Sequence, residues 1–409
     1  MSPDKALVKQ LSPRARILLA GVLLSSVGNG LVLPYMFVYL HNVRGISSAL
    51  TGTIVGFGAL VSLSVSPMIG NIIDHWGPKP VLLASLVISG IGYAEQSTVH
   101  SAGRAFLVMS ICAIGQSAMW PAQGAIATEL TSDSQRERFF GSQFALLNLG
   151  IGIGGVISSA FVSLPDPCTF EWLFRGDGIS YFVYLGVALF LKDVGHRNKQ
   201  ERKENSERSG GWSEVLQDKV FVKVWIVATA AIFLGYAQLE VGFASFATLV
   251  AHVKPSNIAW AYAANTIFIA IFQLWVVKKL RNFSRARSIA IAALLWLCAW
   301  VALAFAGLLS GFAILMIIIC QLIFAMGEMV WSPVMPSIVN QLAPAHLRGR
   351  YNSASSNSWQ IAAIVGPMVA GTLLGAGLQW IWIGTLVCGL ALVSVFALRL
   401  KLPERQSQD

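Results

Sequence analysis

The residue best placed to do chemistry in this sequence is Glu328, which interrupts an otherwise apolar stretch that reads LIFAMGEMVWSPVM. Burying an ionised carboxylate in such a stretch costs several kcal/mol unless the group is paired, hydrated or protonated. Glu328 is therefore a candidate for binding a proton or a cation. Glu240 follows Tyr236 by one helical turn in another apolar stretch and is a second candidate of the same kind.

The residues around Glu328 add to this interpretation. At helical spacing one face carries a carboxylate, aromatic rings, an amide and an adaptable thioether, which together suit an organic cation. The residues of this face are Gln321, Phe324, Glu328, Trp331 and Met335.

These residues lie in a chain whose composition is that of a membrane protein. Of its 409 residues 55% are apolar and only 12% are charged, and the mean hydropathy is +0.65, which excludes a soluble globular domain. Apolar stretches of membrane-spanning length predict an all-α protein with twelve transmembrane helices. The stretches are 16–40, 48–72, 80–98, 104–128, 139–163, 175–191, 221–247, 256–277, 287–309, 312–341, 353–376 and 378–399.

Basic residues fall almost entirely on one side of such a bundle. Of the 29 Lys and Arg residues, 25 lie in the two termini and in the loops that follow even-numbered helices, and 4 lie on the opposite side. Because cytoplasmic loops are enriched in basic residues, both termini are predicted to be cytoplasmic. The net charge of +10 thus reflects topology, and no nucleic-acid partner is expected. Two further acids, Glu95 and Asp177, are expected near the outer ends of their helices, at the membrane interface.

No enzyme signature accompanies these features. The sequence contains no GxSxG, no Walker A motif and no HExxH, and its histidines are scattered. The five cysteines form no CxxC pair, so neither a disulfide framework nor a metal site is indicated. We therefore expect neither an enzyme nor a bound cofactor or metal, and any active transport must use an ion or substrate gradient.

The chain also repeats internally. A charged segment at 192–219 separates two predicted six-helix bundles, residues 1–191 and 220–409. Shifting the sequence by 212 residues aligns 113–138 with 325–350 without a gap, and a shift of 207 suits the first three helices better. In this alignment Gln116 is equivalent to Glu328, Gly154 to Gly366 and Gly28 to Gly235. Duplicated membrane halves are typical of secondary transporters, with a substrate site near the midplane.

The loop GNIIDHWGPKPVLL between the second and third helices resembles motif A of the major facilitator superfamily. The matching residues are Gly70, Asp74, Gly77 and Lys79, while His75 and Pro80 depart from the basic residues of the motif. Gly77 permits a tight turn, and Asp74 can cap a helix N-terminus. The resemblance implies that Asp74, together with Glu129 and Arg138, latches the outward-facing state.

Glycines in the fifth helix are similar to motif C of drug-efflux members, which has a Gly-Pro pair. This chain has Gly154-Gly155 there, after Gly150, and its Gly-Pro pair is Gly366-Pro367 in the other half. Close helix packing explains such small residues. Ile111 occupies the place of the motif B arginine. The helix count, repeat, motif A loop and charged linker resemble the twelve-helix drug:proton antiporter branch.

The resemblance implies the major facilitator fold, with a cavity lined by the first, fourth, seventh and tenth helices. It places Asn29, Gln116, Trp120 and Tyr236 there with both glutamates. The expected function is export of lipophilic small molecules in exchange for protons by alternating access, with Glu328 and Glu240 as the proton-binding groups. The partners would be the substrate, protons and the lipid bilayer. We expect a monomer in the inner or plasma membrane.

Three alternatives stay open. A transporter specific for a sugar, peptide or lysolipid would need more hydrogen-bonding side chains on the cavity helices. A transport-incompetent receptor or sensor would normally carry an added soluble domain. A channel is disfavoured because no selectivity ring or pore loop is visible.

Overall fold

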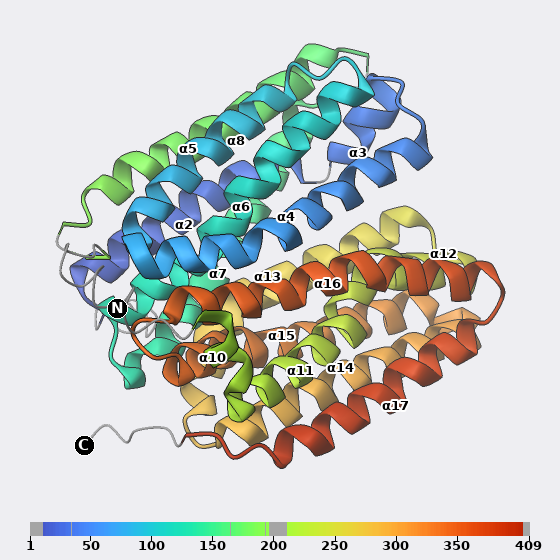
Figure 1. The fold of residues 1–409 in the computed structure, drawn as a ribbon. Coiled ribbons are helices and arrows are strands. Elements are labelled where there is room, and N and C mark those ends of the chain that lie inside the picture. Colours follow the sequence, from blue (N-terminus) through green and yellow to red (C-terminus); the bar gives the residue numbers. More distant parts are fainter. Residues whose placement is uncertain (1–10, 34, 164, 193, 196–210, 404–409) are drawn as a thin grey trace. The chain divides into compact units, whose positions relative to one another are not determined.

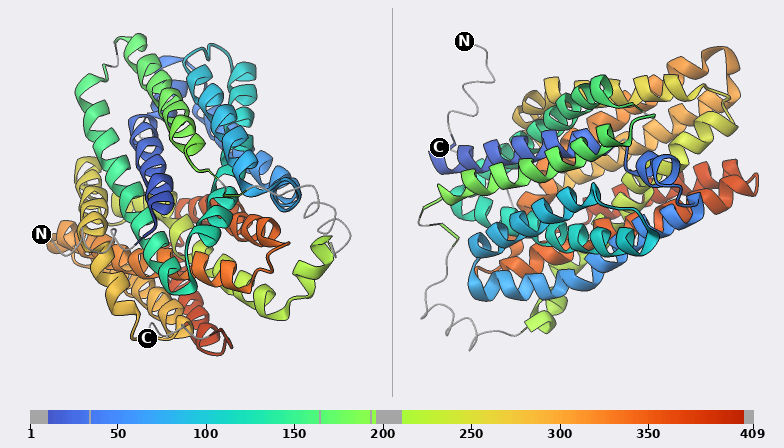
Figure 2. Two further views of the ribbon diagram at one scale, coloured as in Figure 1. Left: turned by 90° about the vertical axis from the view of Figure 1, so that its left-hand side faces the viewer. Right: turned by 90° about the horizontal axis from the view of Figure 1, so that it is seen from above.

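A computed structural model describes residues 11–33, 35–163, 165–192, 194–195 and 211–403, and every regular element in these ranges is a helix (Figure 1). The chain divides into two compact units, Met1–Ser213 with Ala343–Asn357 and Glu214–Leu342 with Ser358–Asp409. Within each unit the helices lie side by side (Figure 2). Most of the predicted linker lies outside the described residues, so the predicted domain boundaries stay a prediction.

The first part of the chain forms one set of helices. They are α2 (Pro13–Val32), α3 (Met36–Val38), η1 (Tyr39–Val43), α4 (Ser48–Trp76), α5 (Pro78–Gln96), α6 (Ala102–Leu130), α7 (Asp133–Phe161) and α8 (Pro167–Leu189). The later part contributes α10 (Gly211–Gln217), α11 (Lys219–Leu234), η2 (Tyr236–Gln238), η3 (Leu239–Phe243), α12 (Ala244–Leu249), α13 (Pro255–Leu280), α14 (Arg285–Leu308), η4 (Ser310–Phe312), α15 (Ala313–Leu342), α16 (Arg348–Gly375) and α17 (Gln379–Leu398).

Ten helices among the described residues are long and apolar enough to cross a membrane. The two further long helices, α5 and α8, are more polar and pack against one another, with α6 and α2 beside them. With α11 to α12 counted as one interrupted helix, the described residues thus form the predicted twelve. Small polar residues begin many of them, because their side chains accept hydrogen bonds from first-turn amides. These residues are Ser12, Ser47, Ser101, Asp166, Asp218 and Ser284.

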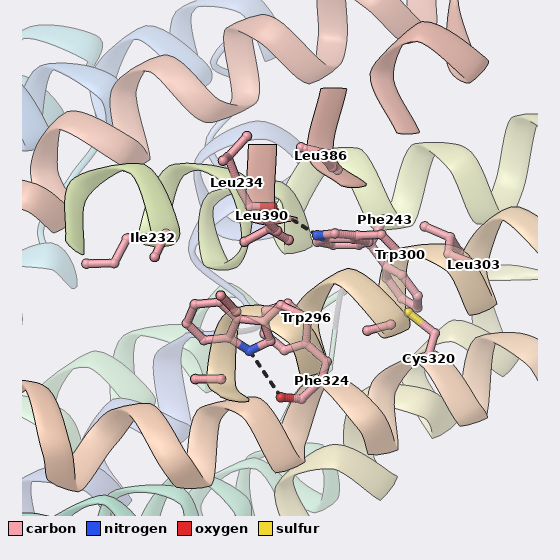
Figure 3. Packing of buried hydrophobic residues seen from close by; sticks show 14 of the residues in the cluster. Ile232, Leu234, Phe243, Trp296, Trp300, Leu303, Cys320, Phe324, Leu386 and Leu390 are labelled. Carbon is pink, nitrogen blue, oxygen red and sulfur yellow. Dashed lines mark hydrogen bonds between the residues drawn. The ribbon is translucent and has the colours of Figure 1, made fainter. Parts of the chain in front are cut away.

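The first helix of each half is interrupted, which the apolar stretches did not reveal. α2 ends at Val32 before a π-helical turn at η1, and α11 ends at Leu234 before η2 and a second π-helical turn at η3. The carbonyl groups released at the second break have partners. Trp300 Nε1 donates to Leu234 O at 2.9 Å (Figure 3), and the Tyr262 hydroxyl donates to Leu239 O at 2.6 Å. Because these two carbonyl groups have partners, the break is compatible with a buried position in the fold.

The sequence repeat reappears in the packing of the two units. A β-carbon on Gly154 would lie 2.8 Å from the backbone of Gly30, and one on Gly366 would lie 2.5 Å from the β-carbon of Ala237. These two contacts are equivalent in the alignment, because Gly154 and Gly366 are 212 apart and Gly30 and Ala237 are 207 apart. Each is an approach between the first and fifth helices of its unit that a larger side chain would prevent.

A second pair of contacts follows the same rule. A β-carbon on Gly115 would lie 2.3 Å from Ser89 Oγ, and one on Gly327 would lie 2.5 Å from the Trp296 ring. Ser89 and Trp296 are again 207 residues apart. The repeat therefore preserves the glycine at each point of close helix approach, while the side chain that faces it changes from the Ser89 hydroxyl to the Trp296 indole. That change places an aromatic ring next to the middle of α15.

Candidate functional site

Glu328 lies in the middle of α15 and is 6% exposed. Asn265 on α13 donates from Nδ2 to Glu328 Oε2 at 2.8 Å. The hydroxyl group of Tyr236, at the break after α11, is within hydrogen-bonding reach of the same carboxyl group. Three elements of one unit thus converge on this acid, and both groups that meet it can donate a hydrogen bond to an oxygen.

Aromatic rings surround Tyr236 on several sides. Its ring centroid lies 5.1 Å from that of Trp296, 5.7 Å from that of Phe324 and 4.5 Å from that of Trp359. The ring centroid of Trp331 lies 5.3 Å from that of Trp296. We refer to Tyr236, Trp296, Phe324, Trp331 and Trp359 as the aromatic cluster. Its edge-on and tilted contacts are those that aromatic quadrupoles favour. Because the aromatic cluster lies beside Glu328, the site combines apolar rings with one carboxyl group.

Gln321 continues the polar side of the site. Its Oε1 accepts a hydrogen bond from Asn265 Nδ2 at 3.2 Å, and its Nε2 has no hydrogen-bond partner among the described residues. A fully buried amide N–H group that has no acceptor lowers the stability of the fold, unless a water molecule or a bound molecule accepts its hydrogen bond. Met335, two turns beyond Glu328 on the same helix, is buried in the hydrophobic core of this unit.

The structure thus brings five predicted residues together in one unit, namely Tyr236, Gln321, Phe324, Glu328 and Trp331. Their role stays a prediction. Three residues of the site, Asn265, Trp296 and Trp359, are not among those predicted from the sequence. Asn265 carried a usable signal as an amide in an apolar helix, whereas the two tryptophans cannot be distinguished in sequence from ordinary core residues.

Three other predicted cavity residues, Asn29, Gln116 and Trp120, belong to the first unit. Gln116, the repeat partner of Glu328, donates from Nε2 to the hydroxyl groups of Tyr181 at 2.5 Å and Tyr93 at 3.2 Å, whose rings are stacked. Asn29 is half-buried on α2, and Trp120 is 40% exposed. The side chain of Glu240 lies outside the described part of the chain. Within the described ranges, no three metal-ligating side chains gather into a metal site.

The motif A loop has partners within the first unit. Asp74 Oδ1 accepts a hydrogen bond from the amide of Gly349 at 2.5 Å, and Oδ2 accepts one from the amide of Arg350 at 3.2 Å. Both amides belong to the first turn of α16. Close packing accompanies these bonds, since a β-carbon on Gly349 would lie 2.5 Å from the carbonyl oxygen of Gly70. A carboxylate at a helix N-terminus is stabilised by the unpaired amides and the helix dipole.

The remaining motif A residues connect to the end of α8. Gly77 adopts a φ of +94°, which lets α4 turn directly into α5. Lys79 donates from Nζ to Leu191 O and from its amide to Gly195 O, and Gly195 in turn donates to Glu129 Oε2 at 2.8 Å. Glu129 therefore binds the segment after α8, while Asp74 binds α16. Arg138 is buried near the start of α7.

Replacing Asp74 with Asn is expected to lower the free energy of unfolding by about 1–3 kcal/mol, because an amide can accept only one of the two α16 hydrogen bonds. The matched control is Asp218→Asn, at the start of α11. There a single oxygen, Oδ1, accepts both amide hydrogen bonds, so an asparagine can replace it. Thermal melting of the purified protein should show a lower melting temperature for the first variant only, and equal melting would contradict this account.

The motif C-like glycines differ in their surroundings. A β-carbon on Gly150 would lie 2.6 Å from that of Ser26, and Gly154 is tighter still, whereas Gly155 has nothing within 4 Å. Pro367, beside Gly366, lies inside α16 without ending it. The expected packing role is therefore possible for Gly150 and Gly154 but has no geometric basis at Gly155.

An ion pair near the start of α8 involves η1. Arg44 binds Glu171 at 2.6 Å and also donates to the Tyr39 hydroxyl at 2.8 Å. Partial burial opposes the charged form of Arg44, but the hydrogen bonds that it donates to Tyr39 and Glu171 outweigh that effect and raise its pKa. The guanidinium therefore stays charged and holds η1 against α8.

The chain belongs to the Major Facilitator Superfamily, whose model matches residues 18–254 and 242–409. The sequence is 23% identical to an uncharacterized MFS-type transporter, YhjO of Bacillus subtilis, over 88% of this chain and 86% of that protein. It is 22% identical to the quinolone resistance protein NorA of Staphylococcus aureus, over 93% of this chain and 95% of that protein. The protein is therefore a multi-pass membrane transporter of small molecules and not an enzyme.

Solved structures agree on the fold. The human organic anion transporter MFSD10 (TETRAN) superposes with a TM-score of 0.73 at 16% identity, covering 94% of this chain and 100% of that one. A bacterial homologue of the iron transporter ferroportin superposes with a TM-score of 0.77 at 15% identity, covering 95% and 99%. At these identities the likeness establishes the fold alone, so the substrate has to be inferred from the site.

Proposed function

We propose that this transporter exports lipophilic cationic or neutral small molecules in exchange for protons. The observation that carries the proposal is the carboxyl group of Glu328, held by Asn265 and Tyr236 at the edge of the aromatic cluster. A carboxylate can hold either a proton or a cation, and aromatic faces attract organic cations. The distant similarity to NorA, a quinolone resistance protein, supports a drug-like substrate.

The charges of the second unit favour a cation over an anion. Its described basic residues lie at or near helix ends, as Lys219 and Lys223 do in α11 and Lys278 and Lys279 do in α13. Because no basic side chain of the described residues pairs with Glu328, its carboxyl group suits a positively charged or neutral substrate. A specific anion transporter would need a cationic side chain in the aromatic cluster.

In the proposed cycle, Glu328, helped by Glu240, takes up a proton from outside the cell. Release of that proton on the cytoplasmic side restores the negative charge that attracts the substrate, and alternating access exchanges the two. The bonds from Asp74 to α16 would favour one conformer in this cycle. Both termini are proposed to be cytoplasmic, since 25 of the 29 basic residues then lie on that side.

The direct test is efflux of a panel of fluorescent lipophilic cations from cells that express the wild-type protein, with and without a protonophore. Dye extrusion that the protonophore abolishes would support proton-coupled export. If the wild-type protein reaches the membrane and moves none of the dyes, the proposal is wrong and a narrow metabolite transporter becomes the better hypothesis.

A further inference from the structure

Asp177 is a fully buried acid that the proposed cycle does not use. The prediction that it lies near an outer helix end is wrong, because α8 begins at Pro167 with Asp166 as its cap and not at 175. Asp177 therefore lies near the middle of this 23-residue helix, with 0% of its surface exposed. A carboxyl group at this depth in a membrane-spanning bundle needs a physical explanation.

The hydrogen bonds of Asp177 do not match what a carboxylate requires. Ser180 Oγ is 3.4 Å from Oδ1, but the single hydroxyl proton is better placed toward the backbone oxygen of Asp177, at 2.7 Å. Oδ2 has no hydrogen-bond partner among the described residues. An ionised carboxylate accepts several hydrogen bonds in proteins, so this geometry suits the uncharged acid far better.

Among the described residues, no positively charged side chain faces this carboxyl group either. On the other side of the carboxyl group is Gly28 of α2, where a β-carbon would lie 2.5 Å from Oδ1. The ionisable side chains around it are Tyr93 on α5, Cys112 on α6 and Tyr181 on α8 itself. None of these carries a positive charge, and the described basic residues of α2 are confined to its first turn.

The fold does not require an acid at this position. α8 and α17 begin 212 residues apart, so Gly389 is equivalent to Asp177. A β-carbon on Gly389 would lie 2.6 Å from the side chain of Leu234, so the same contact between the first and last helices of the second unit is entirely apolar. An acid that the packing does not need and that no described side chain neutralises is best explained by function.

We propose that Asp177 is a second proton-binding site, located inside the first unit between α2 and α8. Its carboxyl group holds a proton while these helices are packed at Gly28. It releases that proton when their separation admits water, and takes one up again on closure. The step is a simple proton transfer between the carboxyl group and water, with no other reactant. This inference rests on proton-coupled export and adds a second proton to it.

The test is infrared spectroscopy of the purified full-length protein at neutral pH, in the carbonyl-stretching region of protonated carboxylic acids. We expect one such band to be lost in Asp177→Asn and kept in the matched control Asp166→Asn. Asp166 has an exposed carboxylate that caps α8, a role that asparagine fills equally well. If Asp177→Asn does not fold, Ser180→Ala keeps the acid but should shift the band, because it removes the neighbouring hydroxyl.

A second infrared measurement, with an exported dye present, distinguishes a proton that Asp177 releases during transport from one that it never releases. Adding a dye that the wild-type protein exports should diminish the Asp177 band. A spectrum unchanged by both Asp177→Asn and Ser180→Ala, or a band that this dye leaves intact, would overturn the proposal. Failure of the proposed function is read separately, as the absence of dye efflux by the wild-type protein, and needs no infrared measurement.

Discussion

Replacing Glu328 with Gln is expected to lower protonophore-sensitive dye efflux strongly while the protein still reaches the membrane. The substitution keeps the size of the side chain and leaves an oxygen for Asn265, which donates to Oε2 at 2.8 Å, but it removes the proton-binding group. Loss of one charged hydrogen-bonding group is worth about 1.5–3 kcal/mol, so efflux should fall about tenfold or more. The measurement is the initial rate of dye efflux, normalised to the amount of protein in the membrane.

The matched control for this variant is Glu95→Gln. The Glu95 carboxylate lies at the end of α5, is 41% exposed and pairs with Arg104 at 2.5 Å. Exposed ion pairs contribute little, so this variant should export at close to the wild-type rate. If Glu328→Gln also exports normally, Glu328 is a packing residue, and the substrate and proton site must lie elsewhere in the protein.

The largest expected effect on stability comes from Gly154→Ala. Its new β-carbon would lie 2.1 Å from the carbonyl oxygen of Val27 and 2.8 Å from the backbone of Gly30, so α2 and α7 would have to move apart. Overpacking of this kind costs about 1–3 kcal/mol and more where backbone atoms must shift. A large fall in melting temperature, or loss of folded protein from the membrane, is the expected result.

The neighbouring glycine provides the control, because a β-carbon on Gly155 has nothing within 4 Å. Alanine is favoured over glycine in a helix by about 1 kcal/mol, so Gly155→Ala should melt at or slightly above the wild-type temperature. Equal destabilisation by both variants would mean that general helix disruption, rather than contact with α2, explains the result. Gly366→Ala tests the equivalent contact in the second unit, where the nearest atom is the β-carbon of Ala237.

Several features follow from the sequence because they depend on local patterns. The lengths of the apolar stretches determine the helices, and serine or aspartate before a stretch marks where it begins. The repeat predicted that Gly154 and Gly366 occupy equivalent places, and their contacts with Gly30 and Ala237 agree. Helix geometry alone also places Gln321 and Glu328 on one face of α15.

Other features depended on which faces meet, and a single sequence does not contain that information. Only the tertiary structure places Asn265 and Tyr236 beside Glu328, assigns Ala343–Asn357 to the first unit and buries Asp177 against Gly28. The physical reason is that helix formation is set by hydrogen bonds between residues four apart, whereas the environment of a carboxyl group is set by side chains from helices far apart in the sequence. The family and the helices were therefore predictable from the sequence, and the partners of its buried acids were not.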